Sequence, residues 1–350
     1  MSEWKNKCRN RNDIRRQLLA TVSAGVLLAA TSTTVNAEDD AAGHAPFWID
    51  LGGQFVWNQN DQQAYLSPFV PAVPLPFEVV SPAEVEKPAH TGLDGNAKIS
   101  FEPAASEWVF SAAITYGRSD RNRFLSQRTE TPDTPTGVLV AYQNVTTKNS
   151  ANHAILDFRA GRDVGLGAAI NSTFNLGVRY VQFSAKNNVL LQSAPTNAGS
   201  PVPYHRVNAH LAADRKFDGV GPSLSWDAST ALIGNQDKSE IALDWGVNGA
   251  LLFGRQSVRG NHHATTVFYT RSYPKSSSHQ SVPLNRKRNM TVPNLGGFAG
   301  LSWRTPNAKV SVGYRADFFF GAMDGGIDAA RRENVGFYGP FASVSVGIGG

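Results

Sequence analysis

Apolar and polar residues alternate at every second position through most of the chain after residue 46. The odd positions of one such segment are Leu93, Gly95, Ala97, Ile99 and Phe101, and the even positions are Asp94, Asn96, Lys98 and Ser100. Successive side chains of a β-strand point to opposite faces, so a period of two predicts strands with one apolar and one polar face. This pattern predicts an all-β fold.

Ten segments follow this pattern, at residues 47–57, 93–103, 107–118, 152–163, 172–184, 215–228, 239–254, 291–304, 308–321 and 334–348. Short connections between them alternate with long ones at 58–92, 119–151, 185–214, 255–290 and 322–333. This asymmetry is typical of outer-membrane barrels, whose short turns are periplasmic and whose long loops are extracellular. We therefore expect a closed antiparallel up-and-down transmembrane β-barrel of ten strands, or of twelve if residues 264–273 belong to an additional hairpin. Closure leaves no unpaired strand edge in lipid.

The first 37 residues have the pattern of a secretion signal. Basic residues from Lys5 to Arg16 precede an apolar run at 18–30 and a small-residue site ending at Ala37. The apolar run is shorter than the roughly 20 residues of a membrane-spanning helix, so we expect it to be cleaved off. The only cysteine, Cys8, leaves with it, and the mature protein is expected to lack disulfides. The expected organisation is a signal peptide at 1–37, a short periplasmic segment at 38–46 and the barrel at 47–350.

The predicted signal also carries most of the net positive charge. It contains six of the 33 Lys and Arg residues and two of the 28 Asp and Glu residues, which leaves 27 basic against 26 acidic residues. A nearly neutral mature chain gives no compositional support for nucleic-acid binding, and no nucleic-acid partner is expected. No later segment approaches 18 consecutive apolar residues, so we expect no membrane-spanning helix.

Aromatic residues on the apolar face gather near the strand ends. Beside the short connections they are Phe101, Trp108, Phe174, Trp226, Trp303 and, slightly deeper, Trp245. At the opposite ends they are Trp57, Tyr116, Tyr180, Phe253, Phe318, Phe320 and Tyr338. Aromatic side chains favour the two membrane–water interfaces, so these two belts predict that the apolar face contacts lipid. A water-soluble sandwich gives no reason to sort aromatic residues by strand end.

If the apolar face contacts lipid, the polar face lines the barrel lumen. Its candidate pore-lining residues are Asp94, Lys98, Glu102, Asp157, Arg159, Arg179, Asp227, Glu240, Asp244, Lys309, Arg315 and Asp317. These charges could form a constriction that sorts solutes by sign and size. They could equally neutralise one another as a network that fills a narrow lumen, because ten strands lie near the eight-stranded barrels that side chains fill.

Two of the predicted loops have a distinct composition. The loop at 58–92 contains six prolines among apolar residues, which predicts a stiff and extended segment. The loop at 255–290 is basic, and its cationic residues are Arg255, Arg259, Arg271, Lys275, Arg286, Lys287 and Arg288. Extracellular cations at this level fit salt bridges to lipopolysaccharide phosphates, although a solvated basic loop explains them equally well. Outer-membrane lipid and lipopolysaccharide are therefore the expected surroundings.

Four short motifs, GVRYVQF at 177–183, FDGVGP at 217–222, YRADFFF at 314–320 and FYGPF at 337–341, point to a family. With them the chain resembles the Legionella major outer membrane protein family of pore-forming barrels, over residues 45–349. The resemblance implies an outer-membrane location with porin-like activity and supplies no catalytic residues. Barrels of this kind often end in an aromatic residue that the assembly machinery reads, whereas this sequence ends at Gly349 and Gly350. That departure puts its assembly efficiency in question.

Three functions are compatible with these patterns. The first is a porin-like channel for passive diffusion of ions or small solutes, and the second is a non-conducting structural or adhesive barrel with partner-binding loops. The third is an outer-membrane hydrolase whose acidic residues and histidine would meet at the outer rim, namely Asp120, Asp133, His153 and Asp324. No nucleophile elbow or metalloprotease motif occurs, so we expect no enzyme activity, no metal and no cofactor. The oligomeric state stays open.

Overall fold

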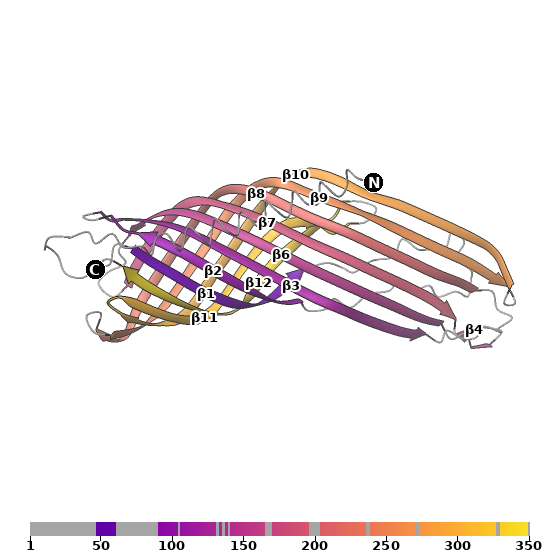
Figure 1. Ribbon diagram of the computed structural model, residues 1–350, viewed down its shortest axis with the longest axis horizontal. Coiled ribbons are helices and arrows are strands. Elements are labelled where there is room, and N and C mark those ends of the chain that lie inside the picture. The colour runs from indigo at the N-terminus through magenta and orange to yellow at the C-terminus, as the bar shows by residue number, and fades with distance from the viewer. Residues whose placement is uncertain are drawn as a thin grey trace, which may run out of the picture. The chain divides into compact units, whose positions relative to one another are not determined.

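Ten long antiparallel strands form a closed barrel in the computed structural model of the protein (Figure 1). The structure describes residues 47–60, 90–103, 106–130, 133–134, 137–138, 141–164, 170–195, 204–235, 239–270, 273–326 and 330–348. The barrel strands are β1 (Phe47–Asn60), β2 (His90–Phe101), β3 (Trp108–Glu130), β6 (Ala141–Asp163), β7 (Ile170–Pro195), β8 (Tyr204–Asn235), β9 (Ser239–Thr270), β10 (Tyr273–Thr305), β11 (Ala308–Asp324) and β12 (Arg332–Ile348). The short strands β4 (Asp133–Thr134) and β5 (Gly137–Val138) pair with each other. No described residue belongs to a helix long and apolar enough to cross a membrane.

The ring closes because the first strand pairs with the last. On β1, Leu51 lies opposite Ala97 of β2 and also opposite Val344 of β12. Every other barrel strand pairs with its sequence neighbours on both sides. The predicted ten-stranded up-and-down barrel is therefore confirmed, and residues 264–270 continue β9 instead of adding a hairpin to the ring. The alternative of twelve strands is wrong.

Short turns join the strands at one end of the barrel, which we call the turn end. Between β2 and β3, the Ser106 amide donates to the Pro103 carbonyl at 3.1 Å, which is the bond of a tight turn. Between β10 and β11 the turn consists of Pro306 and Asn307 alone. The connection is that short because antiparallel neighbours need only a two-residue hairpin.

The outer surface of the barrel is apolar on every strand. Each barrel strand exposes at least one large hydrophobic side chain, and these include Leu51, Leu93, Phe110, Phe158, Leu176, Leu224, Val247, Leu301, Val312 and Val344. Their sequence neighbours point inward and are mostly polar or charged. A continuous exposed apolar band of this extent is unfavourable in water and marks a surface that contacts lipid.

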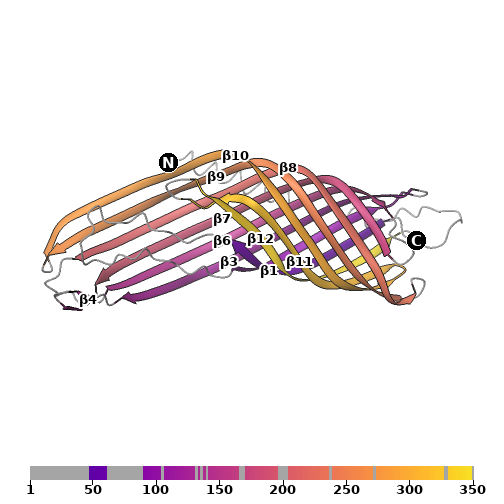
Figure 2. The same ribbon diagram turned by 180° about the vertical axis from the view of Figure 1, so that it is seen from behind.

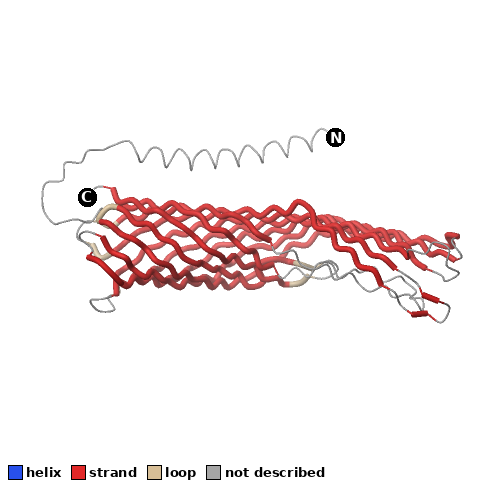
Figure 3. Tube along the Cα trace, turned by 90° about the horizontal axis from the view of Figure 1, so that it is seen from below, coloured by secondary structure: helices blue, strands red, loops and turns tan. Residues whose placement is uncertain are grey.

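Six strands continue far beyond the opposite end of the barrel. Figures 1 and 2 show β3, β6, β7, β8, β9 and β10 running on as a curved sheet, which we call the extension, where β1, β2, β11 and β12 have stopped. The pairing of β8 with β9 continues to the tip, where Tyr204 of β8 lies opposite Tyr269 of β9. Figure 3 shows the same extension from below, almost wholly strand.

The extension consists of segments that the sequence analysis predicted to be loops, so that prediction is corrected. Most described residues within the predicted loops 119–151, 185–214 and 255–290 belong to strands. The described part of loop 322–333 includes the ends of β11 and β12, whereas residues 61–89 of the proline-rich loop lie outside the described residues. One face of the extension is buried and apolar, with Val189, Leu191, Val207, Ala209, Leu211, Ala213, Val258, Ala264 and Leu284.

Candidate functional site

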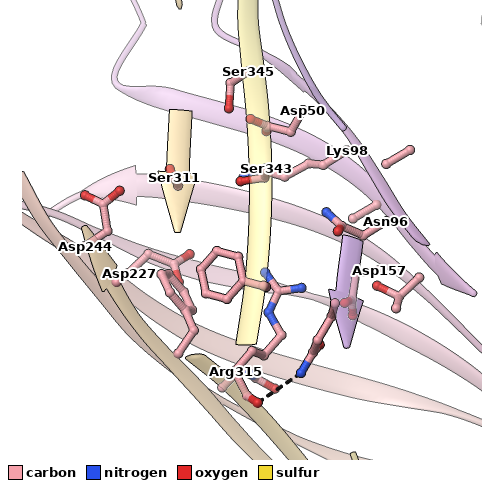
Figure 4. A pocket seen from close by; sticks show the side chains of 18 of the residues that line it. Asp50, Asn96, Lys98, Asp157, Asp227, Asp244, Ser311, Arg315, Ser343 and Ser345 are labelled. Carbon is pink, nitrogen blue, oxygen red and sulfur yellow. Dashed lines mark hydrogen bonds between the residues drawn. The ribbon is translucent and has the colours of Figure 1, made fainter. Parts of the chain in front are cut away.

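The half of the lumen next to the turn end contains a polar cavity of about 380 Å³ (Figure 4). Residues from all ten barrel strands line it. Strand alternation explains this directly, because every second residue of each strand points to the barrel axis. The lining residues that the sequence singled out are Asp94, Lys98, Asp157, Arg159, Arg179, Asp227, Asp244, Lys309, Arg315 and Asp317.

The other two candidate residues lie outside the cavity. Glu102 follows the last residue of β2 and is exposed at the turn end, since the strand ends two residues earlier than the sequence suggested. Glu240 is buried near the start of β9, with its Oε1 atom 4.0 Å from Arg304 Nη1. Glu102 therefore lies beyond the end of the strand, and Glu240 lies inside the barrel without lining this cavity.

Arg179 of β7 connects its strand to four others across the lumen wall. Its Nε and Nη2 atoms donate to the two carboxylate oxygens of Asp157 on β6 at 2.7 and 3.0 Å. Its Nη1 atom donates to Asn248 on β9 at 2.8 Å and to Asn294 on β10. Asp317 on β11 lies 3.8 Å from the same nitrogen. A guanidinium can bond to several acceptors at once because its planar fork presents five donors in fixed directions.

A second charged network lies nearer the turn end. Asp244 on β9 accepts from Lys309 at 2.6 Å and also pairs with Arg304. Arg304 further donates to Ser229 on β8 at 2.6 Å. Sequence reasoning missed Arg304, although it follows the outward-facing Trp303 and alternation alone places it inward. Asp50 was missed as well. Asn96, Asn248 and the serines at 311, 343 and 345 were missed because only charged residues were considered.

His153 and Asp94 form a buried pair across a strand that lies between them. The His153 Nε2 and Asp94 Oδ2 atoms are 3.0 Å apart, and both side chains are only about 5% exposed. β3 separates their strands, and its Gly117 pairs with both residues. A Cβ atom at Gly117 would lie 2.0 Å from Asp94 Oδ1 and 2.1 Å from His153 Cε1. Glycine is therefore what permits the pair to form.

We expect Gly117→Ala to destabilise the barrel by about 2 kcal/mol, because the added methyl group forces apart a buried, charge-assisted hydrogen bond. Urea unfolding of the refolded protein in detergent measures this. Gly95→Ala is the matched control, since a Cβ atom there meets nothing within 4 Å and the cost should stay within about 0.5 kcal/mol. Equal unfolding midpoints for the two variants would contradict the account.

Aromatic side chains close the lumen beyond the cavity. Phe183 of β7 contacts Phe319 of β11 and Phe337 of β12, with ring centroids 4.8 and 5.6 Å apart. Because four strands separate β7 from β12 in either direction around the ring, the contact between Phe183 and Phe337 spans the barrel. Phe217 packs on Phe183 at 6.1 Å. The buried residues at this level, which we call the apolar layer, also include Val56, Ile155, Val181, Leu252, Val292, Ala322 and Met323.

The end of β11 turns inward above the apolar layer. Gly321 has a φ of 70°, a conformation that favours glycine, and the pairing with β12 shifts register there. The Gly321 carbonyl accepts from Gln256 on β9 at 2.5 Å, and Asp324 lies 3.2 Å from Arg286 on β10. The Gly325 carbonyl accepts from Arg215 on β8 at 3.2 Å. These bonds hold the described part of the β11–β12 connection across the outer mouth of the lumen.

Two of the four residues considered for a hydrolase have described side chains, and each forms an ion pair. His153 pairs with Asp94 inside the barrel, and Asp324 pairs with Arg286 at the outer mouth. The side chains of Asp120 and Asp133 lie outside the described part of the chain. Among the described residues, no three His, Cys, Asp or Glu side chains gather into a group that could hold a metal ion.

All thirteen predicted interface aromatics lie on the outer face. Eight of them are among the exposed hydrophobic residues, namely Phe101, Trp108, Tyr116, Phe174, Tyr180, Phe253, Trp303 and Phe320. The other five are partly exposed and neighbour inward-facing residues, and they are Trp57, Trp226, Trp245, Phe318 and Tyr338. Trp226 and Trp245 pack edge to face at 5.2 Å on this surface. Their position at the membrane interface stays a prediction.

The predicted basic loop divides between the two faces of the extension. Arg255, Arg259 and Lys287 are exposed on its outer face. Arg286 turns inward to Asp324, and Arg288 donates to Gln256 at 3.0 Å. Lys275 is exposed near the tip, and Arg271 lies outside the described residues. Contact with lipopolysaccharide stays a prediction for the three outward-facing residues Arg255, Arg259 and Lys287.

A closed barrel with an apolar outer band and a charged interior defines an integral outer-membrane β-barrel protein. The chain belongs to the family described as Legionella pneumophila major outer membrane protein precursor, whose family model matches residues 110–348. Its location is therefore the outer membrane. The fold and family expected from the sequence are confirmed.

Several solved structures are similar to this chain at low identity. The translocator domain of the autotransporter NalP from Neisseria meningitidis is 11% identical with a TM-score of 0.23, and the match covers 97% of each chain. The transport unit of the autotransporter AIDA-I from Escherichia coli is 6% identical with a TM-score of 0.26, covering 93% of this chain and 97% of that one. The P. putida toluene transporter TodX is 7% identical with a TM-score of 0.22, covering 89% and 91%. No curated protein matches the chain. Similarity at this level establishes no function for it.

Proposed function

We propose that this outer-membrane barrel is a narrow channel for ions or small polar solutes. The observation that carries the proposal is the cavity of about 380 Å³, which all ten strands line with carboxylates, cations, amides and hydroxyls. An interior of this kind offers hydrogen-bonding partners in place of a solute's hydration shell. The proposal assigns transport and no chemical turnover to the barrel.

The apolar layer is a constriction in the proposed path. Water-free apolar constrictions prevent ion passage until they widen, so a solute in the charged cavity cannot pass while Phe183 contacts Phe337. Conduction then requires these rings to separate. We therefore expect channel openings that are brief and of low conductance.

The alternative function is a non-conducting structural barrel, and the same ring contact favours it. Side chains that fill the lumen permanently would stabilise the barrel without serving a solute. Under that alternative the extension would carry the function, through partners bound at its outer surface.

Single-channel recording of the refolded protein in a planar bilayer decides between the two functions. We expect discrete current steps in potassium chloride, much smaller than those of sixteen-stranded porins, because ten strands enclose a narrower lumen. Heat-denatured protein at the same concentration is the control. The absence of steps for the native protein, and also for a variant with an opened apolar layer, would reject the channel.

A further inference from the structure

Arg315 differs from most other cations of the cavity in its surroundings. Arg159 and Arg179 pair with Asp157, and Arg304 and Lys309 pair with Asp244. Among the described residues, no carboxylate lies within 4.0 Å of the Arg315 guanidinium, and none accepts a hydrogen bond from it. Asp317 and Asp227 attract the Arg315 guanidinium from beyond that distance, and Arg159 and Arg179 repel it.

Two aromatic rings fix the Arg315 side chain in place. Its guanidinium carbon lies 5.1 Å from the centre of the Phe341 ring and 5.9 Å from the centre of the Phe298 ring. The two rings pack edge to face, with centroids 6.3 Å apart. Cations are attracted to aromatic faces within about 6 Å, and this attraction leaves the N–H groups at the guanidinium edge available.

The backbone of Arg315 is held as well. Its carbonyl accepts a hydrogen bond from Gln54 Nε2 at 3.1 Å, and the same nitrogen donates to the Gly339 carbonyl at 3.2 Å. Gln54 thereby connects β1 to β11 and β12 from inside the lumen. Figure 4 shows Arg315 among the lining residues, with this bond drawn as a dashed line. Arg315 is thus a cation held in a fixed position, and it lines the cavity.

We propose that Arg315 is the centre of a binding site for a small carboxylate anion inside the lumen. The guanidinium fork matches a carboxylate in two parallel hydrogen bonds. Neutral donors also line the cavity, including Asn96 and Ser343. A cavity of about 380 Å³ lies within the size range of small-molecule sites.

The charge balance of the cavity favours a singly charged ligand. The cavity is lined by six aspartates, at positions 50, 94, 157, 227, 244 and 317, and by six cations, at positions 98, 159, 179, 304, 309 and 315. Because these charges balance, doubly charged phosphate adds more uncompensated negative charge to the lumen than a monocarboxylate does, which raises the Coulomb energy. This site deepens the proposed function and rests on it, since the bound carboxylate is a solute in transit.

Binding of ¹³C-labelled acetate to the refolded protein in detergent micelles tests the site, measured by NMR line broadening. Micelles require no conduction, so failure here is distinguishable from failure of the channel proposal. We expect Arg315→Gln to bind acetate roughly tenfold more weakly than the wild type, because it loses a charged bidentate contact. Arg315→Lys should fall between them, since it keeps the charge but loses the fork. Arg162→Gln, whose partner Glu107 is exposed at the turn end, is the control and should match the wild type.

Heat-modifiable migration on a gel establishes that each variant is folded before binding is compared. Acetate binding by folded Arg315→Gln equal to that of the wild type overturns the site, as does absence of binding to the wild type. Inorganic phosphate that displaces acetate at concentrations below those of acetate itself overturns the choice of carboxylate.

Discussion

Replacing Phe183 and Phe337 together with serine is expected to raise the single-channel conductance of the barrel several-fold and to lengthen its open time. These two rings meet across the lumen, and their removal takes away the contact between opposite walls. Serine hydroxyls also hydrate the constriction, so water and ions can enter it. Planar-bilayer recording in potassium chloride measures both quantities.

The control for this experiment is the double leucine variant of the same positions. Leucine keeps the apolar surface and most of the bulk, so the conductance should stay close to that of the wild type. Truncating a buried phenylalanine costs about 3 to 5 kcal/mol, and each variant must therefore be shown to be folded by its heat-modifiable migration. Folded double-serine protein with unchanged conductance would mean that the path is closed elsewhere, most directly by the β11–β12 connection at Asp324.

The sequence predicted the membrane-spanning part of the fold well, because two independent physical patterns agreed there. Alternation placed Leu93 and Asp94 on opposite faces, and the aromatic residues at strand ends gave the lipid face. The extension was missed although alternation continues through it. In β8, Val207, Ala209 and Leu211 are buried, whereas Arg206, Asn208 and His210 are exposed. The prediction limited each strand to the length that crosses a bilayer. A strand that continues beyond the bilayer is not subject to this limit.

The site was predicted only in part for a related reason. Ten of the twelve candidate charges line the cavity because their inward direction follows from the strand period alone. The apolar layer does not follow from it, because Val181 and Phe183 face the lumen while Tyr180 faces outward, so both faces are apolar at that level. Which residues meet across the lumen depends on the register of strands far apart in the sequence, and one sequence does not contain that register. The networks at Arg179 and Arg315 depend on it in the same way.

Arg179→Met is expected to lower the free energy of unfolding by about 3 kcal/mol or more. Arg179 is 3% exposed and donates to Asp157, Asn248 and Asn294, so its loss removes bonds to three other strands. Breaking one partner of a buried ion pair typically costs about 3 to 5 kcal/mol, since the other charge stays buried. We place the cost at the lower end because Arg159 still pairs with Asp157 at 2.8 Å. Urea unfolding in detergent, followed by tryptophan fluorescence, measures it.

The comparison that tests this explanation is with an exposed pair on the same barrel. Arg162 and Glu107 also form an ion pair, but their side chains are 57% and 68% exposed at the turn end. Water already solvates both charges, so Arg162→Met should cost about 1 kcal/mol or less. Adding Asp157→Leu to Arg179→Met should recover part of the lost stability, because it removes the buried carboxylate that has lost its bidentate partner, although Arg159 then loses its own partner. If the double variant is instead less stable than Arg179→Met alone, Asp157 still stabilises the barrel through Arg159, and the cost of Arg179→Met is not that of a poorly compensated carboxylate.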